Sequence, residues 1–189
     1  MISKKFLSIT LIVSFGYIAL HQIQLSVYSG NFFSNEFNTF AYSIYIPHGW
    51  RVLTFLIYGN KCIAGLLIGQ FFTGIYLDNN LETINYELFL AIIIAALCVP
   101  TAGFILKNKY KVSINNFNTK YIFILTVVSA LINSVLVNLI RFSGNTDVNK
   151  EVLISEFFGY FVGETLGVIL IVYLFLIIRR LFYLSIEEI

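Results

Sequence analysis

The chain has 189 residues, of which 58% are hydrophobic and only 12% are charged. A soluble domain has about 25% charged residues, so this composition excludes an ordinary soluble enzyme or nucleic-acid-binding domain. The mean hydropathy of +0.84 and several apolar runs of about 20 residues indicate an integral protein of a lipid bilayer. We expect no nucleic acid as a partner, because no basic patch with interleaved aromatic residues occurs.

The apolar runs predict an all-α fold, a six-transmembrane-helix bundle in a single domain. The first run follows Lys4 and Lys5. It is too long for a signal peptide and no clear cleavage site follows it, so we interpret it as a retained span. Short polar or charged segments separate the other runs. The expected spans cover residues 6–28, 40–58, 62–77, 86–106, 121–142 and 152–182.

Positive charges gather on one side of the predicted bundle. With six spans, the two termini share a side with the second and fourth loops, whereas the other side carries only Arg141 and Lys150 as cations. The residues of the basic side are Lys4, Lys5, Lys61, Lys107, Lys109, Lys111, Lys120, Arg179 and Arg180. By the positive-inside rule, both termini are therefore expected in the cytoplasm.

The second apolar run is interrupted by Pro47, His48, Gly49, Trp50 and Arg51. Proline removes a backbone donor and glycine loosens the turn, so this stretch predicts a kinked or interrupted helix. An arginine in the bilayer core costs at least about 2.5 kcal/mol, and such residues usually face the protein interior. The sequence therefore places a candidate site in this span.

Glu164 in the sixth span is the opposite charge that we expect to meet Arg51. Counted from the outer ends of their spans, the two residues lie at matching depths. We expect them to pair across the bundle, with His48 beside them, on the floor of an outward-opening cavity. Three interpretations stay open at this point: a structural ion pair, a binding site for a polar or charged ligand, and a proton relay.

Other residues complete the predicted site. Trp50 is expected to pack or to form a pocket wall, Gln70 and Asn133 to hydrogen-bond between helices, and His21 to lie at the membrane interface. The candidate ligand-binding residues are His48, Trp50, Arg51, Gln70, Asn133 and Glu164. The candidate helix-packing residues are Pro47, Gly49, Gly65, Gly69, Gly159, Gly163 and Gly167. We expect no metal, cofactor or catalytic residue, because no ligand cluster or nucleophile–base pair occurs.

Two segments resemble the bacterial membrane-associated sensor domain of the first type. YIPHGWRVLTFLIYGNKCIAGLLIGQF, residues 45–71, has a Pro-x-Gly start, a helix ending in glycine and a glycine-containing return helix. GETLGVIL, residues 163–170, is similar to the Gly-Asp-x-x-Gly pattern of that family. The resemblance implies a sensory or ligand-binding module in a bacterial inner membrane. Family members usually carry a cytoplasmic output module, and only nine residues follow Arg180, so we expect signalling through a separate partner.

The alternative function is a small transporter or the substrate-binding subunit of one. Substrate-binding subunits of vitamin importers also have six spans and about this length. They dock through an Ala-x-x-x-Ala face that the first span lacks. An intramembrane enzyme is the least favoured class, because nothing in the sequence forms a nucleophile–base pair.

Overall fold

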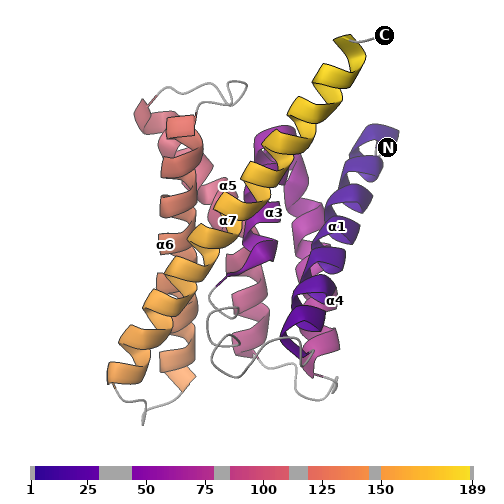
Figure 1. Cartoon of the computed structure of the whole chain (residues 1–189). Coiled ribbons are helices and arrows are strands. Elements are labelled where there is room, and N and C mark those ends of the chain that lie inside the picture. The colour runs from indigo at the N-terminus through magenta and orange to yellow at the C-terminus, as the bar shows by residue number, and fades with distance from the viewer. Residues whose placement is uncertain (1–2, 30–43, 79–85, 111–118, 145–149, 188–189) are drawn as a thin grey trace.

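The structure of the protein, a computed structural model, describes residues 3–29, 44–78, 86–110, 119–144 and 150–187 (Figure 1). Every described element is helical, which confirms the all-α prediction for this part of the chain. The elements are α1 (Lys4–Ser29), α3 (Ile46–Tyr58), the 3-10 turn η1 (Gly59–Cys62), α4 (Ile63–Asp78), α5 (Tyr86–Tyr110), α6 (Thr119–Gly144) and α7 (Lys150–Glu187).

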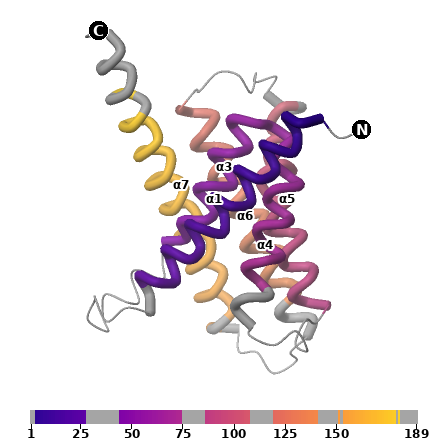
Figure 2. Tube along the Cα trace, turned by 90° about the vertical axis from the view of Figure 1, so that its right-hand side faces the viewer, coloured from indigo at the N-terminus to yellow at the C-terminus, as the bar shows by residue number. Residues whose placement is uncertain are grey.

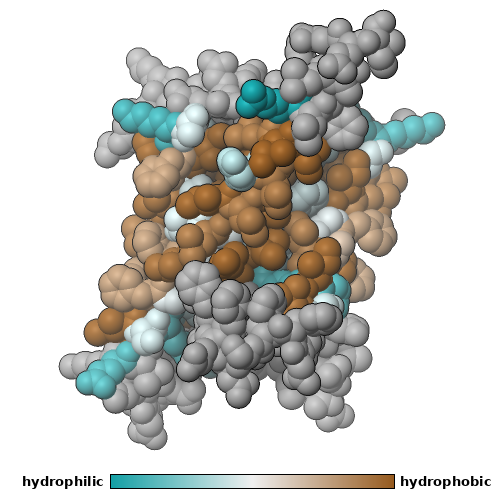
Figure 3. All heavy atoms as spheres, in the orientation of Figure 1, coloured by the Kyte–Doolittle hydropathy of each residue, from teal (hydrophilic) through white to brown (hydrophobic). Residues whose placement is uncertain are grey.

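Five helical segments of the described chain are long and apolar enough to cross a membrane. Four of them lie in α1, α5, α6 and α7, and the fifth, Ile46–Gly74, is the unit formed by α3, η1 and α4. On the face shown in Figure 3, apolar side chains, drawn in brown, form a band across the middle of the molecule. The lengths of the helices and this band fit a multi-pass membrane protein.

The Gly-x-x-x-Gly pair of α4 packs against α1. A Cβ added to Gly65 would lie 2.6 Å from the Cβ of Val13, and one added to Gly69 would lie 3.0 Å from Tyr17. Glycine permits this close approach of two helices. Because the contacts advance in the same direction along both helices, α1 and α4 run parallel.

Helix α3 is short and begins inside the bundle. Its 13 residues span about 20 Å, against about 39 Å for the 26 residues of α1. Pro47 lies in the first turn of α3, where its missing N–H group would have no partner within the helix in any case. Pro47 therefore marks a helix start, so of the two predicted alternatives, a kinked or an interrupted helix, the kink is wrong. Residues 40–43 lie outside the described chain.

Partners on other helices satisfy the backbone at the start of α3. The N–H group of Tyr45 donates to the carbonyl of Gly163 in α7, at 2.8 Å, and that of Ile46 donates to Oε1 of Gln24 in α1, at 2.9 Å. A buried polar group without a partner costs about 1–3 kcal/mol. These two bonds allow non-helical backbone at Ile44 and Tyr45 within the bundle.

Helix α7 is the longest element and packs along α3. Its 38 residues span about 57 Å, and its C-terminal part diverges from the other helices in Figure 2. The Tyr45 carbonyl lies where a Cβ on Gly167 would be, and the Gly167 carbonyl lies against Gly49. Both positions therefore require glycine. The N-terminal end of α1 and the C-terminal end of α7, marked N and C, lie at the same end of the bundle (Figure 1).

Candidate functional site

Arg51 is fully buried in the bundle, and its side chain is 2% exposed. Its Nη1 lies 3.2 Å from Nδ1 of His48, and its Nη2 donates to the hydroxyl groups of Tyr17 at 3.1 Å and Tyr45 at 3.4 Å. The guanidinium carbon also lies 5.6 Å and 5.3 Å from the centroids of the two tyrosine rings. Ring faces at this distance attract a cation, so α1 and the start of α3 surround the charge with acceptors and π-systems.

Glu164 of α7 faces this cation. Its Oε1 lies 3.5 Å from Nη1 of Arg51 and 3.6 Å from Nδ1 of His48, and it accepts a hydrogen bond from Nδ2 of Asn133 in α6. The structure thus brings together four of the six predicted ligand-binding residues. The two opposite charges cancel formally, which a low-dielectric environment requires of buried ions.

The hydrogen bonds of His48 define a neutral ring. Ser129 uses its hydroxyl hydrogen to bond the Thr126 carbonyl at 3.1 Å, so towards His48 it can only accept, from Nε2 at 3.2 Å. The hydrogen therefore sits on Nε2, and Nδ1 is left to accept from Arg51. His48 orients the guanidinium without adding charge.

A cavity of about 180 Å³ adjoins the ion pair. Its polar wall is formed by His21, Arg51, Gln70, Thr73, Asn133 and Glu164, together with Tyr17, Tyr45 and Tyr160. The N-terminal half of α5 supplies the apolar wall through residues such as Ala91 and Ala95. An empty cavity of about 150 Å³ in a protein core holds benzene, so this one has room for a small organic molecule.

Several polar atoms on this wall have no hydrogen-bond partner within the described chain. They are Oε2 of Glu164, Oδ1 of Asn133, Nε2 of Gln70, Nε of Arg51 and both ring nitrogens of His21. Each such atom costs about 1–3 kcal/mol when it stays unpaired. The residues that carry these atoms all line the cavity, so a bound molecule or an ordered water there would be close enough to offer them partners after small side-chain movements.

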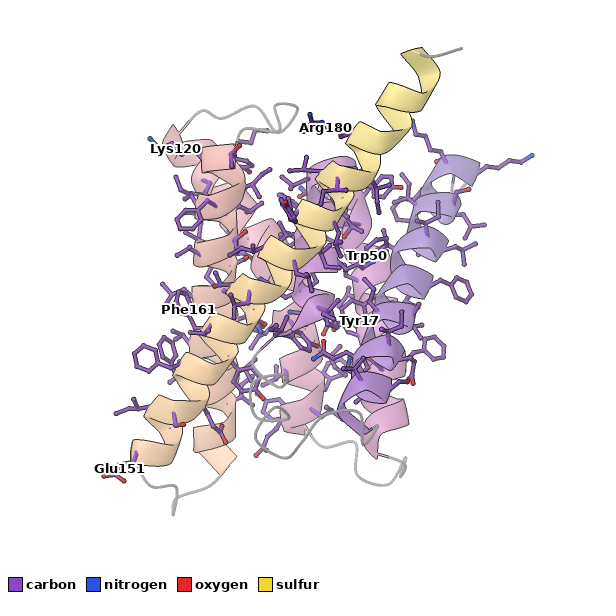
Figure 4. All side chains as sticks on the ribbon, in the orientation of Figure 1. Tyr17, Trp50, Lys120, Glu151, Phe161 and Arg180 are labelled. Atoms are coloured by element: carbon purple, nitrogen blue, oxygen red, sulfur yellow. The ribbon has the colours of Figure 1, made fainter. Side chains whose placement is uncertain are left out.

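Two predicted ligand-binding residues do not line the cavity. His48 contacts Arg51 but is not among the residues that line the cavity. Trp50 packs between α3 and α1, where its indole N–H donates to the Val13 carbonyl at 3.0 Å and its ring covers Gly16 (Figure 4). Trp50 is thus a packing residue, because its single donor is already used at the helix contact.

The predicted packing glycines divide into two groups. Those at positions 49, 65, 69 and 167 lie in tight helix contacts, and Gly163 presents its carbonyl to Tyr45. Gly159 is exposed, and no described atom lies within 4 Å of a Cβ added there. The residues that precede Ile44 lie outside the described chain, so the packing role expected for Gly159 stays a prediction.

Sequence reasoning missed the contribution of α1. His21 was expected at the membrane interface, but it is 8% exposed and lines the cavity. It belongs to a buried polar stripe of α1, formed by Thr10, Ser14, Tyr17, His21 and Gln24. These residues recur every three or four positions, the spacing of one helix face. That spacing was present in the sequence and identifies the face of α1 that the bundle covers.

Comparison of the chain with protein-family models, with curated proteins and with solved structures found no match. Within the described residues, no group of three or more His, Cys, Asp and Glu side chains is placed to hold a metal ion. The site itself consists of a neutralised ion pair, two amides, a histidine and a cavity beside them.

Proposed function

We propose that the protein is a multi-pass membrane receptor that binds a small polar molecule inside its helix bundle. The observation that carries this proposal is the cavity beside Arg51 and Glu164, lined by residues with buried polar atoms that lack partners within the described chain. A clamp that served only to hold α3 against α7 would be expected to satisfy its own polar atoms, as buried groups in proteins generally do.

The proposed topology has six crossings, of which the second contains α3 from Ile46 onward. Lys120 and Arg180 lie at one end of the bundle and Glu151 at the other (Figure 4). By the positive-inside rule, the basic end faces the cytoplasm and both termini lie there. The cavity then belongs to the outer half of a bacterial inner-membrane protein, in line with the resemblance to membrane-associated sensor domains.

Helix α7 is the proposed route from the cavity to the cytoplasm. It carries Glu164 at the cavity and continues without a break to Glu187. A ligand that binds one position of α7 more tightly than another shifts the population of these positions. A cytoplasmic or membrane signalling partner would read this shift at the basic end, near Lys120 and Arg180, where anionic lipids also bind.

A transporter is the second candidate function, and the short helix α3 favours it. Helices that start or stop at mid-membrane form the substrate sites of many secondary transporters. The two candidates differ in one measurable way. A transporter reconstituted in liposomes moves the bound molecule across the membrane, whereas a receptor holds the molecule without net flux.

Native mass spectrometry of the protein purified from its membrane tests the binding function. We expect a small-molecule adduct on the wild type and on Thr126→Val, a control in which a buried hydroxyl outside the cavity is removed. The adduct should be lost in Gln70→Met, which removes an unpaired donor on the cavity wall. Absence of any adduct, or equal retention in Gln70→Met, would contradict the proposal.

A further inference from the structure

We infer that the molecule bound in the cavity is net-neutral and bifunctional, with an N–H donor group at one end and a carboxylate or carbonyl acceptor at the other. A small zwitterionic amino acid has this chemistry. The inference rests on the proposed function, because it names the class of ligand for the same cavity.

The wall formed by α6 and α7 is an acceptor wall. Asn133 donates its Nδ2 to Oε1 of Glu164, which fixes the amide so that its Oδ1 points elsewhere. Oδ1 of Asn133 and Oε2 of Glu164 are the atoms left without partners. An amide oxygen and a carboxylate oxygen only accept hydrogen bonds, so the group of the ligand that meets them has to carry hydrogens. An ammonium group carries three.

The wall formed by α1 and α4 offers donors. Nε2 of Gln70 is an amide nitrogen with hydrogens and no partner, and His21 has two unpartnered ring nitrogens, of which one carries a hydrogen in the neutral ring. Helices α1 and α4 pack together, as do α6 and α7, and the two pairs lie on different sides of the bundle (Figure 1). A ligand acceptor such as a carboxylate therefore fits the Gln70 side.

The charges of the site limit the net charge of the ligand. Arg51 and Glu164 are 3.5 Å apart and cancel, and His48 is neutral by its hydrogen bonds. A bound ion of either sign would leave one charge unmatched at membrane depth, where charge is costly. A zwitterion keeps the sum at zero while it gives each wall the group that the wall lacks.

The volume of the cavity suits a small ligand. About 180 Å³ is slightly more than the engineered cavity of about 150 Å³ that holds benzene. A small amino acid fits wholly within this space. Alanine and glycine are therefore suitable probes, and acetate and methylammonium, which carry the acceptor or the donor alone, are matched controls.

Thermal unfolding of the full-length protein in detergent, with each probe at the same concentration, tests the inference. We expect alanine or glycine to raise the melting temperature in a concentration-dependent manner, because a ligand that binds only the folded state stabilises it. Acetate and methylammonium should leave it unchanged. Gln70→Met should weaken binding of the amino acid by about tenfold or more, and Thr126→Val should not.

The alternative outcomes separate this inference from the proposed function. A stabilisation by methylammonium alone, or by acetate alone with loss of the effect in Gln70→Met, overturns the inferred ligand class and leaves the binding function standing. A native adduct whose mass identifies a molecule with a net charge, or a molecule with only donor groups or only acceptor groups, likewise overturns the ligand class and leaves the binding function standing. If no probe stabilises the protein and its mass spectrum shows no adduct, the cavity holds water and both proposals fall.

Discussion

Replacing Arg51 with methionine should destabilise the protein more than replacing Glu164 with glutamine. At the observed 3.5 Å, and with an effective dielectric constant of about 20, the two charges attract by roughly 5 kcal/mol before the cost of desolvation. Removing one member of a buried pair typically costs about 3–5 kcal/mol, because it leaves the other charge uncompensated. The neighbours of each residue decide how far that cost is reduced.

The two residues have unequal support. In Glu164→Gln, the guanidinium keeps His48 and the hydroxyl groups of Tyr17 and Tyr45 as acceptors, together with two ring faces. In Arg51→Met, the carboxylate keeps one described donor, the amide of residue 133. We therefore expect losses of about 3–5 kcal/mol for Arg51→Met and about 1–3 kcal/mol for Glu164→Gln. The double variant should lose about 1–3 kcal/mol less than the sum.

Unfolding in mixed micelles with increasing SDS measures these free energies for all four proteins of the cycle. The loss in Arg51→Met should also shrink as the pH falls, because a carboxyl group that takes up a proton is neutral and no longer needs a cation. Glu164→Gln has no such group and should show no comparable gain. Additive losses in the double variant, or a larger loss in Glu164→Gln than in Arg51→Met, would refute the reasoning.

Three further predictions concern packing, binding and topology. Gly167→Ala should lower the melting temperature by several degrees because its methyl group would overlap the start of α3, whereas Gly159→Ala, whose methyl group would meet no atom of the described chain, should be neutral or gain up to about 1 kcal/mol. Gln70→Met should raise the melting temperature of the ligand-free protein, because it removes a buried donor without a partner; a drop would mean that this donor is satisfied. Cysteines introduced in residues 108–119 should be labelled from the cytoplasm and those in residues 143–150 from outside, and the opposite pattern would exclude the proposed orientation.

The helices themselves could be predicted closely from the sequence. Apolar runs in a low-charge chain have to form helices, because lipid offers no partner to the backbone, and polar segments end the runs. The contact between Arg51 and Glu164 was also predictable, because lipid offers no partner to a charge. Each charge needs an opposite one at its own depth, and no other span of the sequence offers one as deep.

The start of α3 and the role of Trp50 could not be predicted in the same way. Apolar residues occur on both sides of residue 46, so the hydropathy pattern does not show where helical hydrogen bonding begins. That point is set by the Gly163 carbonyl and the Gln24 side chain, which come from other helices. Trp50 is an amphipathic ring that suits a pocket as well as a helix contact, and the gap left by Gly16 on α1 decides between them.

The register between α3 and α7 follows from their glycines. Tyr45 bonds to the carbonyl of Gly163, and Gly49 lies against the carbonyl of Gly167. From the first contact to the second, the position advances by four residues in both chain segments. The two helices therefore run parallel, with one turn of α3 beside each turn of α7. Larger side chains at these positions would push the helices apart and remove this fixed register.

This register makes a long side chain necessary at position 51. It sets the backbone of Arg51 level with Ile169, five residues or about 7.5 Å along the axis beyond Glu164. Side chains on a helix lean towards its N-terminus, so the guanidinium extends back along α3 and reaches the carboxylate. The N-terminal end of α3 is also where the cavity lies, and the same lean carries the charge to the cavity wall. A short polar residue at position 51 would leave Glu164 without its cation, and the cavity without the charge that balances this carboxylate.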